Sequence, residues 1–367
     1  DGFNSMPMIV NRFNANQIAP SSHVGLHAQL VEYDMFDSDG MNVGFNPVLT
    51  AAPGETITYK WYAGKIDIDV ATGELTGTPV EYGAINLMPA DPIKGSNKGL
   101  IGALIVEPEG STWADGRKIT TGKRKNKVTT ITPDGEVGED GLLSRAALTI
   151  CTSGEFPCEP GITSFRDFVL VFQDDVNMRF TNGQTFQTPC ANGPGTCAIS
   201  VFAGDPVPTV SEEEEPEDSG MKGLNYSTDP LWLRLGIGPT AVSGATRQVD
   251  FTNAFANIGG QDPVTPVFTA ASGEDVRFRV LKPGGHNRNQ VVTQHGHLWA
   301  RHPFNSDSTE IDPYNDKTFW HGEQLGHGPS NHVNVVPLGG AGPAGDYLDR
   351  DMVPVHVYNG EWGIFRV

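Results

Sequence analysis

The chain has 367 residues, which suggests about two domains, and hydrophobic residues make up 38% of it, enough to bury a core in each. Its formal net charge of −19 makes nucleic acids and anionic membrane surfaces poor partners, because both repel an acidic protein. Metal ions, cationic substrates and basic proteins fit this charge better, although an acidic surface that serves only solubility is the alternative. No apolar run approaches the ~20 residues of a membrane-spanning helix.

Turn-forming residues are frequent, with 44 Gly and 27 Pro, and few windows are rich in strong helix formers. This composition predicts an all-β protein, in which many short strands are joined by turns. In the first half we expect strands within residues 23–33, 56–62, 99–106 and 165–172, where apolar and β-branched residues alternate or run together.

An acidic run, SEEEEPEDSG at residues 211–220, separates the two halves. Like charges repel and little of this run can be buried, so we expect an exposed linker and place the domain boundary there. In the second half the pattern predicts strands at residues 275–281 and 361–367, together with one that carries His295.

The four cysteines form two close pairs, Cys151 with Cys158 and Cys190 with Cys197. The spacing differs from the C-x-x-C of zinc sites, so we read the pairs as local disulfides, with bridges across the pairs left open. Disulfides indicate an oxidising compartment, and we expect the protein in the periplasm, at the cell surface or in the medium.

Histidine is concentrated late in the chain, with eight of its ten residues between His286 and His356. His295 and His297 stand two apart in an expected strand, so both project from the same face, and imidazole suits borderline metals such as copper and zinc. They are half of a candidate metal site. The competing interpretation is a pair of hydrogen-bonded or surface histidines.

Several separated motifs occur in the order found in one family. They are Pro53-Gly54 before Tyr59-Lys60-Trp61, Gly99–Val106 (GLIGALIV), Gly284–Asn289 (GGHNRN), His295-Gly296-His297, Glu323–His332 (EQLGHGPSNH), Gly345-Asp346-Tyr347 and Trp362–Val367 (WGIFRV). Together they resemble the multicopper oxidases, most closely the large bacterial multi-domain branch associated with oxidation of manganese or other metals.

The resemblance implies an all-β fold of two tandem cupredoxin-like Greek-key β-sandwich domains. Residues 1–210 would form the first, lacking its opening strands and carrying long insertions. Residues 211–220 would be the acidic linker, and residues 221–367 would form a second, His-rich domain. The absent strands suggest that N-terminal cupredoxin domains precede this portion or that a neighbouring chain donates a strand.

The family passes electrons from a blue copper, held by two His and a Cys, to a trinuclear copper cluster held by His-x-His pairs. In this chain the first pair is reduced to His27 followed by Gln29. The blue-copper His and one cluster His have become Gln290 and Thr293, while His295 falls on a cluster ligand. No Cys lies near the C-terminus, so the complete relay cannot be assembled from these residues.

For copper ligation the resemblance leaves His295 and His297, joined by His327 and His332, with His297 better suited to orient a neighbouring ligand. His27 is the remaining candidate from the first half.

Three functions follow from this resemblance. The first is the C-terminal portion of a secreted multicopper-oxidase-like protein that oxidises metal ions or small reductants with O2. The second is a copper-free cupredoxin-like structural or assembly module. The third is a metal-binding or storage module that uses its histidines without redox chemistry.

Overall fold

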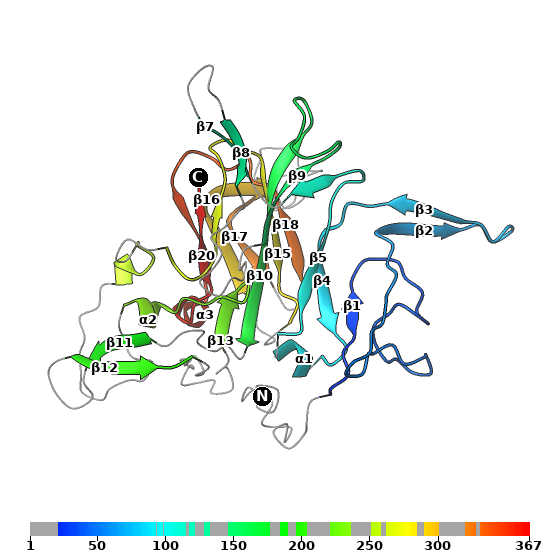
Figure 1. Cartoon of the computed structure of the whole chain (residues 1–367), viewed down its shortest axis with the longest axis horizontal. Coiled ribbons are helices and arrows are strands. Elements are labelled where there is room, and N and C mark those ends of the chain that lie inside the picture. Colours follow the sequence, from blue (N-terminus) through cyan, green and yellow to red (C-terminus); the bar gives the residue numbers. More distant parts are fainter. Residues whose placement is uncertain are drawn as a thin grey trace.

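The computed structural model describes residues 21–92, 94–97, 99–114, 117–121, 128–132, 146–176, 184–189, 196–203, 221–235, 251–257, 262–284, 290–300, 320–327 and 331–367. Within these ranges the helices are short: α1 (Lys94–Asn97), α2 (Leu231–Arg234), α3 (Pro354–Tyr358) and a 3-10 turn at Phe251–Asn253. Everything else that is regular is strand, which confirms the all-β prediction (Figure 1). No helix among the described residues is long and apolar enough to cross a membrane.

The first large sheet is built around one long strand, β10 (Ser164–Val176), and has the order β18-β15-β10-β9-β6. β10 runs parallel to β15 (Val276–Leu281), and antiparallel to β9 (Ala146–Cys151) and β13 (Met221–Leu224). β18 (His332–Val335) pairs with β15, and β6 (Thr112–Ala114) pairs with β9. Apolar residues on both faces of β10 explain why it lies in the interior of the sheet.

The second large sheet has the order β14-β20-β19-β16-β17 and faces the first across the main core. Its strands are β14 (Val267–Thr269), β16 (Gln290–Ala300), β17 (Trp320–His327), β19 (Asp346–Asp351) and β20 (Trp362–Arg366). The rings of Phe268, Phe278 and Phe365 surround that of Phe168, with centroids 5.1–5.6 Å from it. Two sheets closed over a shared aromatic core form a β-sandwich.

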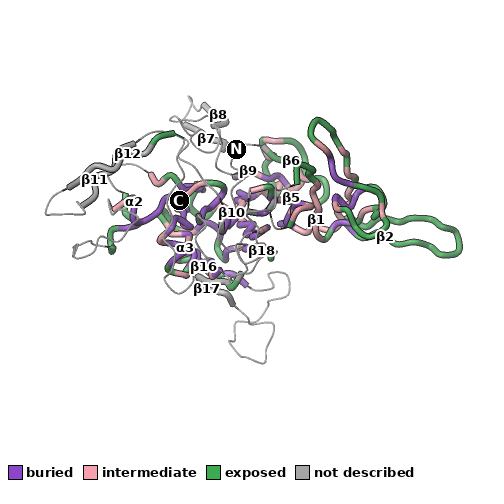
Figure 2. Tube along the Cα trace, turned by 90° about the horizontal axis from the view of Figure 1, so that it is seen from below, coloured by how far each residue is buried: buried purple, intermediate pink, exposed green. Residues whose placement is uncertain are grey.

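A smaller sheet, β1-β4-β5, lies beside the sandwich and consists of β1 (Leu26–Ala28), β4 (Gly83–Pro89) and β5 (Gly102–Val106). Three two-stranded hairpins complete the described strands. They are β2 (Gly64–Ile68) with β3 (Leu75–Pro79), β7 (Arg117–Thr121) with β8 (Val128–Thr132), and β11 (Gln184–Pro189) with β12 (Thr196–Val201). The β2–β3 hairpin projects away from the body and is exposed along almost its whole length (Figure 2).

The predicted strand at residues 56–62 is not formed, apart from one bridge between Tyr62 and Glu32. Here hydrogen bonds to a residue outside any sheet replace those of a strand partner. The Lys60 backbone N–H donates to Ser38 Oγ (3.0 Å), and Trp61 Nε1 donates to the Ser38 carbonyl (3.0 Å). The strand expected at residues 23–33 shrinks to β1 for a similar reason, because only Leu26–Ala28 finds a strand partner, in β4. The other predicted strands are present.

The sheets do not divide where the domain boundary was predicted. Residues 204–220, which include the acidic linker, lie outside the described residues, so that boundary stays a prediction. However, β10, from the predicted first domain, pairs with β13 and β15 from the second over several residues. The main sandwich therefore takes strands from both predicted domains.

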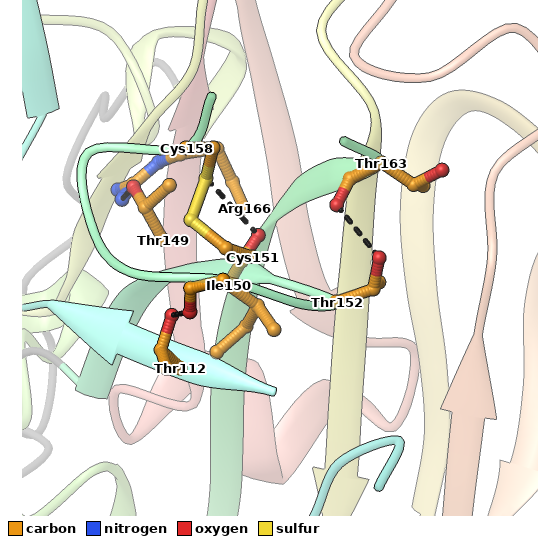
Figure 3. The surroundings of a disulfide bond; sticks show 9 residues. Thr112, Thr149, Ile150, Cys151, Thr152, Cys158, Thr163 and Arg166 are labelled. Carbon is orange, nitrogen blue, oxygen red and sulfur yellow. Dashed lines mark hydrogen bonds between the residues drawn. A yellow bond between two sulfur atoms is a disulfide. The ribbon is translucent and has the colours of Figure 1, made fainter. Parts of the chain in front are cut away.

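One of the two predicted disulfides is present. Cys151, at the buried end of β9, is bonded to Cys158 with the Cα atoms 5.4 Å apart (Figure 3). Beside it, Thr152 Oγ1 donates to the Thr163 carbonyl (3.0 Å), across the loop that connects β9 and β10. The second pair includes Cys190, which lies outside the described residues, and stays a prediction.

Replacing Phe168 by Ala should lower the free energy of unfolding by about 3–5 kcal/mol, because the ring is fully buried among three other aromatic rings. Urea unfolding followed by circular dichroism measures the loss. Phe45→Ala is the matched control: its ring is fully exposed, so the change should stay within about 0.5 kcal/mol. Equal losses for the two variants would contradict this assignment of the core.

Candidate functional site: a buried charge network between the two sheets

Six ionisable side chains meet at one place in the sandwich, and all are fully buried. We call them the buried charge network: Asp174, Lys222, Lys282, Asp351, His356 and Glu361. They come from both sheets, since Asp174 and Lys222 lie on β10 and β13, Lys282 follows β15, Asp351 ends β19, His356 lies in α3 and Glu361 precedes β20.

The acidic side of the network is arranged around His356. Its Nδ1 lies 2.7 Å from Asp351 Oδ2 and 3.7 Å from Glu361 Oε2. Gln290, the first residue of β16, donates from Nε2 to Glu361 Oε1 (2.6 Å). Asp351 Oδ1 accepts the backbone N–H of Val291 (3.1 Å) and that of Val353 (2.8 Å). The imidazole and both carboxyl groups are therefore held in fixed positions.

The basic side is arranged around Asp174. Lys222 Nζ contacts Asp174 Oδ1, and Lys282 Nζ lies 3.5 Å from Asp174 Oδ2. His356 Nε2 lies 3.8 Å from the same Oδ2, so the imidazole stands between the carboxyl groups of Asp174 and Asp351. The result is a row of Asp351, His356 and Asp174, with the two lysines at the Asp174 end.

The local sequence explains how Asp351 and Glu361 come together. Pro354 begins α3, where its fixed φ suits the first helical turn, and the helix ends after five residues. The chain then turns at Gly360 with φ +113°, and a Cβ at this position would overlap Thr228 Oγ1. Backbone hydrogen bonds from Asp351 N to Glu361 O (3.2 Å) and from Glu361 N to His356 O (3.1 Å) close the loop.

Burial and the neighbouring charges shift the acids in opposite directions. Burial raises the pKa of Glu361 well above its usual value, and the nearby carboxyl groups of Asp351 and Asp174 add to this. Burial would also raise the pKa of Asp174, but the two lysines and the histidine outweigh it and lower that pKa. With three acids and two lysines, a single proton on either Glu361 or His356 brings the network to neutrality.

Asp351, His356 and Glu361 are the one group of three in the described part of the chain whose possible ligand atoms lie within 4.8 Å of one another. A blue copper requires a thiolate, and this group offers two carboxylates and an imidazole. A divalent ion would also need Glu361 and the imidazole deprotonated, and with both lysines present it would leave a net positive charge out of water. The donor set does not fit the family's blue copper.

His295 and His297 lie in β16, and among the described residues they are not brought to a cluster of possible metal ligands. Gly296 between them has φ +71°, and the β16–β17 register shifts between Thr293 and Leu298, so the simple same-face rule fails. His297 is buried, with Nδ1 2.9 Å from the His295 carbonyl and Nε2 3.0 Å from the Ala341 carbonyl. Both ring nitrogens thus face carbonyl oxygens.

The other three candidates come from three different strands, His27 from β1, His327 from β17 and His332 from β18. His27 Nδ1 is 3.0 Å from the Asp39 carbonyl and 3.1 Å from its carboxyl group. His332 begins β18, and its partial burial lowers its pKa. His327 ends β17 with its backbone opposite Gln290, and its side chain lies outside the described residues. Metal binding by any of these five histidines stays a prediction.

Sequence reasoning found Gln290 as a departure from the family pattern but missed the rest of the network. His356 was noted only as part of the histidine-rich region. A weak signal existed for the lysines, because Lys222 lies within the buried part of β13 and Lys282 directly follows the apolar strand β15. A lysine there has to be paired, but the sequence does not name its partner.

No protein family model matches the chain, and no curated protein matches it. Among solved structures, the blue copper oxidase from Nitrosomonas europaea overlaps with a TM-score of 0.39 at 13% identity, covering 94% of this chain and 69% of that one. A multicopper oxidase gives 0.39 at 13% identity, with 94% and 70% covered. The copper nitrite reductase from N. europaea gives 0.38 at 11%, with 95% and 75% covered. At this level of overlap none of them assigns a site or a role to residues of this chain.

Glu361 should make stability fall as pH rises. Because its pKa is raised in the folded state, the folded chain holds the proton more tightly, and that stabilisation is full below the unfolded pKa of about 4.3 and is lost as pH rises through the folded pKa. Glu361→Gln keeps a neutral polar group there and should flatten this dependence, which is at most about 1.4 kcal/mol per pH unit for one group. Urea unfolding between about pH 5 and pH 8 measures it.

The exposed Glu74, on the β2–β3 hairpin, provides the matched control as Glu74→Gln. Its profile should follow that of the unsubstituted protein. A Glu361→Gln profile that also follows it would contradict the raised pKa of Glu361.

Proposed function

We propose that this chain is a copper-free, cupredoxin-like structural module, in which a buried ion-pair network takes the place of an electron-transfer copper. The observation that carries this proposal is the pair of fully buried lysines. Lys222 and Lys282 bring two positive charges to Asp174, which shares the His356 imidazole with Asp351, and both charges also act to lower the pKa of Glu361. A site that already contains its own cations gains little from another.

Gln290 gives independent support. By resemblance to the multicopper oxidases it replaces the histidine that binds blue copper, and its side chain donates to Glu361 within the network. A metal ligand is expected to be replaced by an amide that hydrogen-bonds within the protein when the site serves packing and no longer binds a metal.

On this proposal the module belongs to an extracytoplasmic multicopper-oxidase-like protein, in which copper-dependent oxidation would fall to other cupredoxin domains or to a neighbouring chain. The Cys151–Cys158 disulfide supports an oxidising compartment. The role of the module would be to support assembly.

A second candidate function is metal binding without blue-copper chemistry. The close approach of Asp351, His356 and Glu361 favours it, because a carboxylate and imidazole set suits zinc or a non-blue copper. This candidate and the structural proposal make opposite predictions for one experiment.

Incubation with Cu2+ or Zn2+ followed by dialysis should leave no stoichiometric metal in the network and no change in the melting temperature. The expected reason is that Lys222 and Lys282 already place two cations in the network, so that an added divalent ion would leave a net positive charge out of water. Metal analysis, visible absorption and electron spin resonance measure the outcome. Nitrogen hyperfine coupling that is lost in His356→Ala would favour the second candidate. A blue thiolate absorption band would contradict the conclusion that the network holds no blue copper.

The same variant also tests the structural role directly. Without any metal present, His356→Ala should lower the free energy of unfolding by about 3–5 kcal/mol, since it leaves Asp351 and Asp174 without a partner that they share while fully buried. His23→Ala, at an exposed histidine, is the matched control and should cost no more than about 0.5 kcal/mol. A network that tolerates the loss of His356 would not be structural.

A further inference from the structure

A cavity of about 420 Å³ lies away from the buried charge network, between the end of β5 and strands β6, β9 and β10. We call it the Trp113 cavity. Its walls are largely apolar, formed by Ile105, Ala147, Leu148, Ile150 and Val169. Its volume falls in the range of small-molecule sites in proteins, which combine apolar walls with a few placed polar groups.

The polar groups of this cavity are two carboxyl groups and a hydroxyl. Asp167 is 3% exposed and, like the partly buried Glu107, lines the cavity. Ser111 lines it too, and its Oγ is buried without a hydrogen-bond partner within the described residues. All three groups can accept a hydrogen bond from a ligand.

One guanidinium serves both acids. Arg279 Nε donates to Asp167 Oδ1 (2.9 Å), and its Nη2 lies 3.1 Å and 3.0 Å from the two oxygens of Glu107. Arg279 is not among the residues that line the cavity. Two carboxyl groups against one cation leave an excess of one negative charge when both are ionised. That excess faces the cavity.

Trp113 supplies the other element of a cation site. Its indole is 63% exposed, large for a tryptophan, and lines the same cavity. The face of an indole attracts cations, most strongly where water is partly excluded. An exposed aromatic ring that lines the same cavity as two carboxyl groups suits a cation with an apolar body.

From these observations we propose that the Trp113 cavity binds a small organic cation, with a primary ammonium group directed at Asp167, Glu107 and Ser111 and an apolar or aromatic body against the walls and Trp113. A bare metal ion is less well matched, since most of the lining is apolar. An anion would meet two carboxyl groups. This site is separate from the buried charge network and does not depend on the structural role proposed for it.

Burial raises the pKa of Asp167 well above its usual value, with Arg279 lowering it and Glu107 raising it. A cation bound beside Asp167 would favour its ionised form, as the Arg279 guanidinium does.

Isothermal titration with 2-phenylethylamine tests the proposal, with 2-phenylethanol as the neutral probe of the same shape. The ammonium should bind at least ~10-fold more tightly than the alcohol, because only it pairs with the acids. Equal affinities would reduce the cavity to an apolar surface and overturn the proposal. Absence of binding by the amine at millimolar concentration would also overturn it.

Two variants locate the binding. Trp113→Ala should weaken amine binding ~5-fold or more and Trp113→Phe should restore part of it, and since the ring is largely exposed both should fold. Glu107→Gln should remove the preference for the amine over the alcohol, with thermal unfolding recorded because Arg279 loses one partner. Glu74→Gln, far from the cavity on the β2–β3 hairpin, should change nothing. If Trp113→Ala and Glu107→Gln both leave the affinity for the amine unchanged, the ligand binds elsewhere and the assignment to this cavity is wrong.

Discussion

Asp174 is fully buried, and the ionic contacts of Lys222, Lys282 and His356 with it come from three separate segments of the chain. A charge in this position is tolerable only if all of its partners are in place, because an unpaired buried ion costs several kcal/mol. The partners are contributed by strands and turns of both sheets. Packing of the sandwich and completion of the network are therefore coupled. The aromatic core brings the two sheets together, and the ion pairs form only when the ends of the strands are in one arrangement.

Arg279 has a comparable role where the small sheet meets the sandwich. From β15 it bonds Asp167 on β10, Glu107 after β5 and Asn334 on β18. Asn334 in turn accepts the N–H of Ala84 and donates to the Tyr82 carbonyl, at the start of β4. Polar contacts thus supplement a small apolar cluster of Ala84, Ile101, Val171 and Leu281 in joining the two parts. This junction also forms the charged side of the Trp113 cavity.

The buried charge network and the Trp113 cavity suit different chemistry because they differ in how accessible they are to a ligand. The buried charge network has its cations built in, and all six of its ionisable side chains are fully buried and out of reach of a ligand from solvent. The Trp113 cavity has an unbalanced acid and an exposed aromatic ring. This difference in charge balance and access makes the Trp113 cavity the better place to look for a ligand.

Local sequence was sufficient for the fold class and for much of the strand pattern. Apolar runs such as Phe165–Phe172 and Trp362–Val367 bury themselves wherever they pair, and Cys151 and Cys158 are too close in sequence to require a long-range partner. It was insufficient at Thr56–Tyr62, where the alternating pattern is real but Ser38 and Glu32 supply the hydrogen bonds instead of a neighbouring strand. A strand needs a partner, and periodicity does not identify one.

The sequence by itself therefore determined an all-β chain and indicated the local Cys151–Cys158 disulfide, because both depend on residue type and short spacing. Only the tertiary structure decided that β10 joins β15 across the predicted domain boundary, and that Asp174 meets Lys222, Lys282 and His356. Those pairings join residues from roughly fifty to nearly two hundred positions apart, and their energies depend on burial and distance, which no local pattern contains.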